Sequence, residues 1–399
     1  MKKALAIILA LVLVFALVAC NKETEGNNSA PPSNSNSANS PAPSDSPSAP
    51  PDVAVQDIGA TGEIGYITDD VDHEARDTYA FTYVFSNPTN LTMYMTECFE
   101  KLGERLNYTI TTATANGDAN LYVNNIIPAV LLTEPDGLII DMVFEYQERL
   151  REILDEAGVP YIALFNSVTD DDGYELVPVV MMNQYLNGVK QVELMHDSRE
   201  EFWGADVDTS KIGLIALGYS LNADLTTRAR GAMDKFTELY PGNTIVDADA
   251  TTVGAMNAQA GYDLVSSFIS SNPEVEYWFV SSCVEDMSIG AARATEALNK
   301  TDSVLITGSG ASVLPGEWDA GYEGNWIGNF AVSNYQYAVP AVCGLIALAD
   351  GRATPETLWE DLKRPGDTAA QFVVGLETIT HANYKEFFIA IEESFGIYR

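Results

Sequence analysis

Several polar and aromatic side chains in this sequence are of the types that hold a small polar solute. Asn87 offers an amide that both donates and accepts hydrogen bonds, and Asn166 offers a second one beside the ring of Phe165. Arg228 carries a planar fork of N–H groups that suits paired hydroxyls or a carboxylate. Glu285 adds a carboxylate near the start of a predicted helix. A few oriented polar groups beside an aromatic face are typical of a small-molecule site.

Each of these residues also has a purely structural interpretation. Asn87 can cap the helix that follows it, and Phe165 can belong to the core. Arg228 can form a surface salt bridge, and Glu285 can cap the helix at Met287. Four further candidates lie at the predicted ends of strands: Asp141, Asn183, Tyr219 and Asn329.

The sequence lacks the motifs on which common enzyme classes depend. The three histidines are scattered, and no HExxH, clustered Cys/His, GxSxG or Walker A pattern occurs. The acidic run Asp170-Asp171-Asp172-Gly173 does not complete an EF-hand, because Val168 and Val179 stand where acidic ligands are required. The sequence therefore predicts a binding protein rather than an enzyme, with no cofactor and no metal site.

Alternating strand-like and helix-like segments must position these side chains. The β-rich run Tyr79–Phe85 precedes an amphipathic segment at 91–106, and similar pairs follow along the chain. Such alternation predicts right-handed βαβ units and parallel sheets. The polar stretch 197–210 interrupts the alternation, which then restarts. We therefore expect an α/β fold of two doubly wound parallel-sheet lobes joined by a hinge, with the ligand cleft between them.

The first twenty residues have the layout of a bacterial secretion signal. Lys2 and Lys3 precede an uncharged apolar run that is short for a membrane span, and Leu17-Val18-Ala19-Cys20 resembles a lipobox. In lipoproteins with that motif the Cys thiol receives a diacylglyceryl group, so we expect lipidation at Cys20 and a location on the extracytoplasmic face of the cell membrane. An ordinary signal peptide with an incidental Cys is the alternative.

Composition shifts divide the rest of the chain. The segment after Cys20 is rich in Ser, Asn and Pro and cannot bury enough apolar surface to fold, which is typical of a tether. The expected parts are a signal peptide at 1–20, a disordered tether at 21–57, an N-terminal lobe at 58–197 with about 333–352, and a C-terminal lobe at 198–332 with about 353–399.

Several short motifs occur in the order and spacing of a known family. They are Ser86-Asn87-Pro88 after the first strand, residues 134–140, residues 157–162, Arg228-Ala229-Arg230-Gly231, residues 272–276 and residues 287–291. Together they resemble the sugar-binding periplasmic proteins of the ribose-binding type, over residues 79–351. The resemblance implies a two-lobed type 1 fold with three hinge crossovers. It also implies a ligand site lined by the Asn-Pro motif, and delivery of the ligand to an ABC permease.

The sequence departs from that family at three positions. Val284-Glu285 stands in place of Asn-Asp, Ser309-Gly310 in place of Phe-Asp, and Phe165-Asn166 in place of Asp-Arg. In relatives those groups hydrogen-bond sugar hydroxyls. The expected solute is a sugar or a sugar-like polyol, and the departures point away from a pentose or hexose bound in the usual way.

Charge and cysteine content restrict the partners. The net charge of −36 argues against nucleic acid and against an anionic bilayer, since both would repel the chain. We expect a monomer whose partners are a sugar-like solute, ABC permease subunits and, through the lipid anchor only, the membrane. Cys98, Cys283 and Cys343 are predicted to be buried small hydrophobic residues, with one disulfide as the alternative.

Two other functions fit parts of the sequence. A sensor that presents a bound ligand to a membrane receptor kinase would share the fold and differ in its partner. A lipid-anchored hydrolase on an α/β fold is disfavoured by the missing nucleophile and metal motifs.

Overall fold

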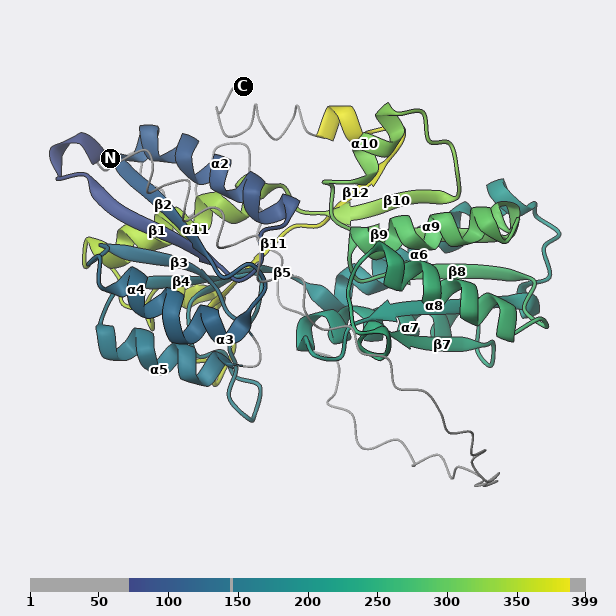
Figure 1. Ribbon diagram of the computed structural model, residues 1–399, viewed down its shortest axis with the longest axis horizontal. Helices are drawn as coiled ribbons and strands as arrows, with labels where there is room; N and C mark the ends of the chain where they lie inside the picture. Colours follow the sequence, from purple (N-terminus) through teal and green to yellow (C-terminus); the bar gives the residue numbers. More distant parts are fainter. Residues whose placement is uncertain (1–71, 144–145, 388–399) are drawn as a thin grey trace, which may run out of the picture. The chain divides into compact units, whose positions relative to one another are not determined.

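Two six-stranded sheets organise residues 72–143 and 146–387, which are the residues that this computed structural model describes (Figure 1). The first sheet has the strand order β11-β5-β4-β3-β1-β2, and the second has the order β12-β10-β9-β8-β6-β7. Neighbouring strands are parallel except β10 and β12. The predicted fold class, two doubly wound α/β lobes, is confirmed. The signal peptide, Cys20 and the tether lie outside the described residues.

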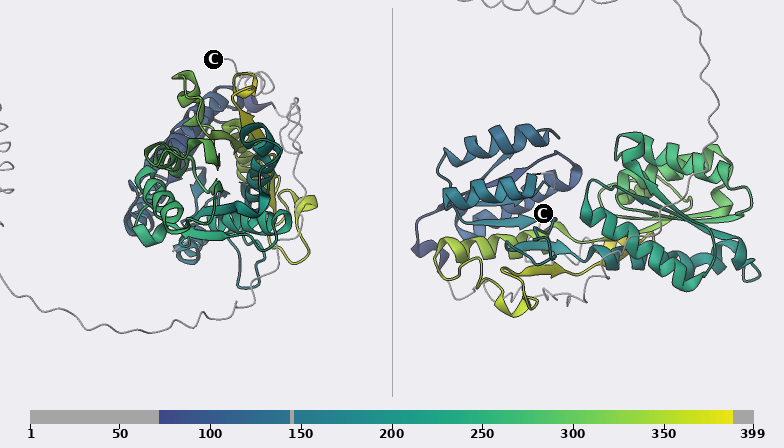
Figure 2. Two further views of the ribbon diagram at one scale, coloured as in Figure 1. Left: turned by 90° about the vertical axis from the view of Figure 1, so that its right-hand side faces the viewer. Right: turned by 90° about the horizontal axis from the view of Figure 1, so that it is seen from below.

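The first sheet is covered by helices on both faces (Figure 2). Because successive side chains of a strand point to opposite faces, Tyr83 packs into the core beneath α2 and α11, whereas Val84 packs into the core beside α4 and α5. The strands are β1 (Tyr79–Phe85), β2 (Tyr108–Thr114), β3 (Gly137–Asp141), β4 (Tyr161–Leu164), β5 (Val179–Met182) and β11 (Gln371–Val374). The helices are η1 (His73–Ala75), α2 (Asn90–Leu106), α3 (Ala119–Leu121), η2 (Tyr122–Ile126), α4 (Ile127–Leu131), α5 (Gln147–Ala157) and α11 (Asn334–Ala349).

The second sheet repeats this plan with α6 and α7 on one face and α8, α9 and α10 on the other. Its strands are β6 (Ile212–Gly218), β7 (Ile245–Asp249), β8 (Tyr277–Ser282), β9 (Val304–Ser309), β10 (Trp326–Ala331) and β12 (Glu377–Thr380). Its helices are α6 (Gln184–Trp203), α7 (Ala223–Leu239), α8 (Ala258–Ser271), α9 (Glu285–Ala297) and α10 (Leu314–Asp319). Single turns of 3₁₀ helix in this lobe are η4 (Thr209–Lys211), η5 (Ala250–Val253) and η6 (Thr301–Ser303), whereas η7 (Glu360–Leu362) packs against the first lobe.

The chain passes between the two sheets three times: from β5 to α6, from β10 to α11 and from β11 to β12. The lobe boundary predicted within 197–210 is wrong, because α6 begins before that stretch, extends into it and packs on α7 and β9. A break in composition marked the end of a helix rather than the end of a lobe. The first crossover lies at Met182-Asn183 instead.

The C-terminal segment serves both lobes. We predicted that about 353–399 belongs to the C-terminal lobe, and this is wrong for the part up to β11, because Ala353, Leu358 and Phe372 pack in the core of the first lobe. In Figure 1 the yellow segment runs from β11 to β12, and β11 pairs in parallel with β5 of the first sheet. β12 pairs in antiparallel fashion with β10 of the second sheet. Gly375-Leu376, between these two strands, is a crossover that the apolar pattern does not distinguish from a continuous strand.

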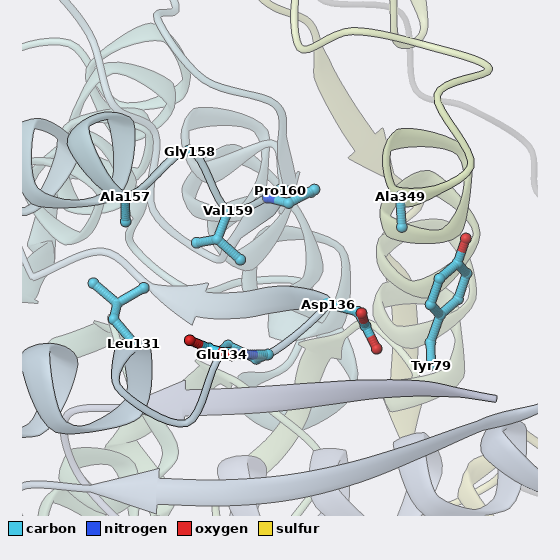
Figure 3. A pocket seen from close by; sticks show the side chains of 10 residues that line it. Tyr79, Leu131, Glu134, Asp136, Ala157, Gly158, Val159, Pro160 and Ala349 are labelled. Carbon is cyan, nitrogen blue, oxygen red and sulfur yellow. The ribbon is translucent and has the colours of Figure 1, made fainter. Parts of the chain in front are cut away.

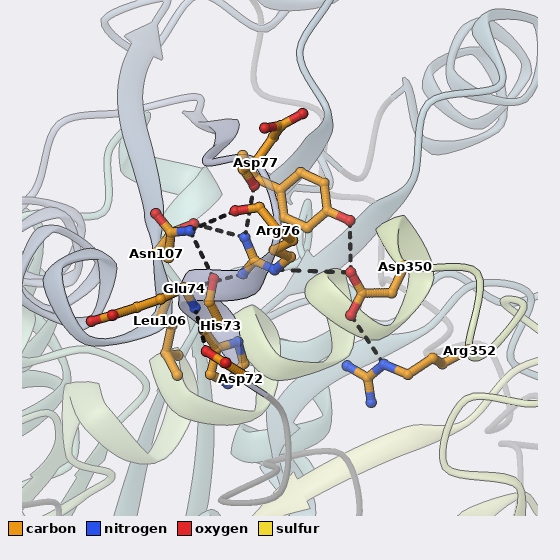
Figure 4. A network of polar contacts seen from close by, with 10 residues as sticks. Asp72, His73, Glu74, Arg76, Asp77, Leu106, Asn107, Asp350 and Arg352 are labelled. Atoms are coloured by element: carbon orange, nitrogen blue, oxygen red, sulfur yellow. Dashed lines mark hydrogen bonds and ion pairs between the residues drawn. The ribbon is translucent and has the colours of Figure 1, made fainter.

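A polar network fixes the start of the described chain at the amino ends of the first sheet's strands (Figure 4). Arg76 donates from Nη1 to the carbonyl of Asn107 (2.8 Å) and from Nη2 to that of Leu106 (2.7 Å). Its guanidinium lies over the ring of Tyr79, 4.3 Å from the centroid, and the Tyr79 hydroxyl donates to Asp350 (2.7 Å). These bonds join the ends of α2 and α11 to the beginning of β1.

Paired glycines let neighbouring helices of the second lobe touch backbone to backbone. A Cβ on Gly188 of α6 would lie 1.9 Å from the carbonyl oxygen of Arg228. A Cβ on Gly231 of α7 would lie 2.1 Å from that of Tyr185. Both contacts are impossible for a larger residue without moving the helices apart. The glycine of the Arg-x-x-Gly motif is therefore explained by the contact between α6 and α7.

Replacing Gly188 with Ala should destabilise the protein by about 1–3 kcal/mol, because the added methyl overpacks a backbone contact. The thermal midpoint, followed by circular dichroism, should fall by several degrees. Gly316→Ala in α10 is the matched control, since a Cβ there meets nothing within 4 Å. Equal midpoints for the two variants would contradict the close contact between α6 and α7.

Candidate functional site

The predicted residues gather at the carboxyl ends of the strands. In the first sheet the strand order reverses between β1 and β3, and in the second between β6 and β8. Ligands of doubly wound folds bind at such reversal points, because the loops that follow the two strands diverge to opposite faces. Asn87 and Asp141 lie at the ends of β1 and β3, and Tyr219 and Glu285 follow β6 and β8.

Asp141 organises the loops around the first reversal point. Ser86 Oγ donates to its Oδ2 (3.0 Å), and Asn166 Nδ2 donates to its Oδ1 (2.8 Å). Burial raises the pKa of Asp141, although these bonds oppose the shift. The Asn166 amide is therefore held with its donor side on Asp141, which leaves its carbonyl oxygen to accept a bond from a solute.

Asn87 keeps its side chain free. It is exposed, and its amide makes no hydrogen bond to the residues that the structure describes. Helix α2 is instead capped by Thr89, whose Oγ1 accepts from the backbone N–H of Thr92 at 3.2 Å, while Thr92 Oγ1 accepts from the N–H of Thr89 at 2.8 Å. The helix-capping interpretation of Asn87 is wrong.

Phe165 forms an aromatic pair with Tyr337 of α11. The two rings meet edge to face with centroids 5.0 Å apart. Phe165 has a φ of 69°, a left-handed conformation that is uncommon for a bulky residue and often marks a functional position. Its ring is half-buried, so part of it can still contact a solute. The sequence did not reveal Tyr337, because it lies in a helix whose other residues are mostly apolar.

Arg228 is buried, so the surface-salt-bridge interpretation is wrong. It is 5% exposed. Nε donates to Gln184 Oε1 at 3.1 Å, Nη2 donates to the same oxygen, and Nη1 donates to the carbonyl of Cys283. Burial lowers the pKa of this guanidinium. Neutral acceptors therefore hold most of the fork, and a second N–H on Nη1 stays available.

Asp224 is a residue that the sequence interpretation missed. It lies one turn before Arg228 on α7, is 7% exposed, and accepts bonds from Ser167 N (3.3 Å) and Ser167 Oγ (3.4 Å). Ser167 follows β4, so these bonds link a loop of the first lobe to a helix of the second. Burial raises the pKa of Asp224 to about 6, against the opposing effects of Ser167 and of the Arg228 charge. The only signal in the sequence is its i,i+4 spacing to Arg228.

Glu285 and Asn329 position a loop. Glu285 accepts from the backbone N–H groups of residues 312–314 at 2.7 to 3.1 Å and from Nδ2 of Asn329 at 2.8 Å. Both carboxylate oxygens are thus occupied within the protein. Glu285 does not cap α9 either, because it is that helix's first residue and the N-cap is Val284. Both side chains therefore stabilise the loop that follows β9.

Asn183 and Tyr219 lie at strand ends, as predicted. Asn183 Oδ1 accepts from the N–H of Leu186 (2.9 Å) and so caps α6, which leaves its Nδ2 free to donate. Tyr219 is half-buried against the core of the second lobe. Cys98, Cys283 and Cys343 are buried, in agreement with the prediction.

A cavity of about 420 Å³ lies at the opposite ends of the strands (Figure 3). Its lining includes Tyr79, the first residue of β1, Glu134 and Asp136 before β3, and Pro160 before β4. Asp136 is already engaged, since its Oδ2 accepts from the N–H of Ala80 (2.7 Å). We do not assign the solute site to this cavity, because parallel α/β sheets bind ligands at the carboxyl ends of their strands.

Comparison with known proteins decides the family. A family model described as a periplasmic binding protein domain matches residues 81–314. The chain belongs to the periplasmic binding protein family. Among curated proteins, none matches the sequence.

Solved structures share the fold of this periplasmic binding protein at low sequence identity. An ABC transporter solute-binding protein from Actinobacillus succinogenes with bound D-allose has 14% identity and a TM-score of 0.60, over 78% of this chain and 100% of its own. An arabinose-binding protein from Geobacillus stearothermophilus has 18% identity and a TM-score of 0.59, over 78% and 99%. A solute-binding protein from Bacillus halodurans with bound myo-inositol has 16% identity and a TM-score of 0.57, over 79% and 98%.

The described part of this periplasmic binding protein contains neither a candidate membrane span nor a cluster of metal ligands. Within 72–143 and 146–387, no helix is long and apolar enough to cross a bilayer. In the same residues, no three His, Cys, Asp or Glu side chains gather as metal ligands.

A second buried carboxyl group supports the Ser167 loop of this periplasmic binding protein. Glu175 Oε1 accepts from the N–H of Val168 (2.8 Å), and its Oε2 accepts from Nε2 of Gln371 (2.8 Å). Burial raises the pKa of Glu175 from its usual 4.5 to about 8, although these two bonds oppose the shift and the Asp224 charge adds to it. Glu175 is therefore mostly protonated at neutral pH and joins the loop after β4 to β11 without adding a charge.

The stability of this periplasmic binding protein should fall as Glu175 ionises. Because its pKa is higher in the folded state, this carboxyl favours folding at low pH, and the advantage is lost as the pH rises through about 8. Between pH 5 and 8 the free energy of unfolding of the natural protein should decline more steeply than that of Glu175→Gln, by up to about 1.4 kcal/mol per pH unit.

Urea denaturation at a series of pH values measures this difference. Glu156→Gln, at an exposed position of α5, serves as the control and should follow the natural protein. Parallel curves for the natural protein and Glu175→Gln would contradict the assignment.

Proposed function

We propose that this chain is an extracytoplasmic solute-binding lipoprotein of an ABC importer. It binds a sugar or a sugar-like polyol between its two lobes, at the carboxyl ends of the strands, and delivers it to a permease. One observation carries the proposal: side-chain amides, a held guanidinium and a partly exposed aromatic ring lie at the carboxyl ends of strands in a two-lobed binding-protein fold.

The chemistry of these groups suits a neutral polyhydroxyl solute. Every hydroxyl both donates and accepts, and the free amide of Asn87, the carbonyl oxygen of Asn166 and the Nδ2 of Asn183 match that demand. The remaining N–H of Arg228 can donate one hydrogen bond to a solute oxygen. It cannot form a bidentate pair with a carboxylate, because Gln184 already accepts from Nε and Nη2 of the guanidinium. Phe165 offers a ring to the C–H face of a sugar. The structural neighbours with D-allose, arabinose and myo-inositol support the same class.

Features outside the described residues support the anchoring. The Leu-Val-Ala-Cys ending of the signal and the Ser-, Asn- and Pro-rich segment after it fit lipidation at Cys20 followed by a tether from 21 to 57. Two acyl chains are enough for stable anchoring. In this proposal the protein works as a monomer by binding alone, without a cofactor, and its macromolecular partners are the ABC permease subunits.

A sugar or polyol should raise the thermal midpoint of the protein produced from residue 51 onward. A ligand at about 100 times its dissociation constant adds about 2.7 kcal/mol, which shifts the midpoint by several degrees. The panel comprises sugars, polyols, nucleosides and amino acids. Arg228→Ala should abolish the shift, and Asn87→Ala, at an exposed position, should weaken it.

Arg230→Ala is the control for Arg228, because this residue lies on the same helix but is exposed and pairs with Asp234. Its response should equal that of the natural protein. The absence of a shift with every sugar and polyol, from folded and ligand-free protein, would refute the proposed solute class.

Cys20→Ser should release the protein from the membrane. Without the thiol no lipid can be attached, so the protein should move from the membrane fraction to the soluble fraction and lose metabolic labelling with palmitate. Ser33→Ala, in the same region, should leave both unchanged. Continued labelling of Cys20→Ser would place the lipid on another residue.

A further inference from the structure

We infer that Gln184 is the positioning residue for Arg228. It fixes the direction of the N–H that meets the solute and keeps the guanidinium from collapsing onto Asp224. This inference rests on the proposed function, since it explains how the binding arginine of that site is oriented.

The contacts of Arg228 leave its side chain little freedom. Gln184 Oε1 accepts from both Nε (3.1 Å) and Nη2, and the Cys283 carbonyl accepts from Nη1. The other N–H of Nη2 points to the sulfur of Met182, 3.6 Å away. Only one of the five N–H groups of the guanidinium is then unassigned, and its direction is set by the other four.

Gln184 binds the Nε and Nη2 N–H groups of Arg228. Without Gln184, these N–H groups could turn and bind the carboxylate of Asp224. The two residues of α7 are four apart, a spacing at which a carboxylate and a guanidinium pair readily. Asp224 is instead bonded to Ser167 at 3.3 and 3.4 Å. Removing the Gln184 acceptor would let the fork turn to Asp224 and compete with Ser167. The Gln184 amide thus keeps Arg228 available to donate to the solute and Asp224 available to accept from Ser167 of the first lobe.

The position of Gln184 depends on the fold around it. It is the first residue of α6, directly after the first crossover, and it is 7% exposed. The contact of Gly188 with the Arg228 carbonyl brings α6 and α7 close enough for a short amide to reach the fork. A buried amide oxygen without a donor would cost about 1–3 kcal/mol, so the two residues satisfy each other.

Gln191 provides a matched comparison on the same helix. It is fully buried, and its Oε1 accepts from Ser281 Oγ (2.7 Å) and from the N–H of Ser282 (3.0 Å). It has no bond to Arg228. Gln191→Leu therefore removes a buried glutamine that makes at least as many hydrogen bonds as Gln184, and it leaves the direct contacts of the guanidinium in place.

The binding experiment measures dissociation constants by calorimetry with arabinose, D-allose and myo-inositol as probes. Gln184→Leu should weaken binding at least tenfold, Gln184→Glu should stay within a few-fold of the natural protein, and Gln191→Leu should change it less than threefold. In an Arg228→Lys background, which lacks the fork, Gln184→Leu should have little further effect. An equal loss in both backgrounds, or no loss in either, would overturn the inference.

A second measurement needs no ligand. In protein labelled with ¹⁵N-arginine, the Nε–H signal of Arg228 is assigned by its absence from Arg228→Lys. The Nε–H proton of Arg228 should exchange slowly with water in the natural protein and in Gln191→Leu, and rapidly in Gln184→Leu. An unchanged signal in Gln184→Leu would overturn the positioning role. If none of the probes binds the natural protein, the proposed function fails for these solutes, and the exchange rate alone decides whether Gln184 holds Arg228.

Discussion

The burial of the Arg228 guanidinium is the constraint on which the second lobe is built. A charge removed from water must be surrounded by oriented acceptors, and here they are neutral: the Gln184 amide and the Cys283 carbonyl at the end of β8. Gln184 can reach the fork only if α6 lies against α7, and the glycines at 188 and 231 make that contact possible. The close packing of α6 on α7 is therefore required both for the stability of the lobe and for the orientation of Arg228.

The same constraint explains how the two lobes are connected to the site. α6 begins directly after the first crossover, so the segment that links the sheets also supplies the residue that orients Arg228. Asp224, left free by that arrangement, accepts bonds from Ser167 of the first lobe. Glu175, neutral at ordinary pH, supports the Ser167 loop without repelling Asp224. A solute bound beside these groups would meet donors and acceptors whose directions are already fixed.

The sequence predicted the fold class and most strands, and it singled out Arg228 as a candidate site residue, because apolar periodicity and a family-like motif are local signals. It did not predict the lobe boundaries, since a buried strand such as β11 looks the same whichever sheet it joins. Nor did it predict Asp224, Tyr337 or Gln184, whose roles depend on neighbours brought together by packing. Glu285 and Asn329 were identified as site residues, but only the hydrogen-bond network shows that their polar atoms are largely used inside the protein.

We infer that solute binds at the carboxyl ends of the strands of both sheets. Hydrogen–deuterium exchange, with and without the sugar or polyol that raises the thermal midpoint most, tests it directly. Bound solute should slow exchange in 86–89 and 165–167 of the first lobe and in 219–228 of the second. Protection confined to 134–136 and 157–160, which line the cavity at the amino ends of the strands, would contradict this site.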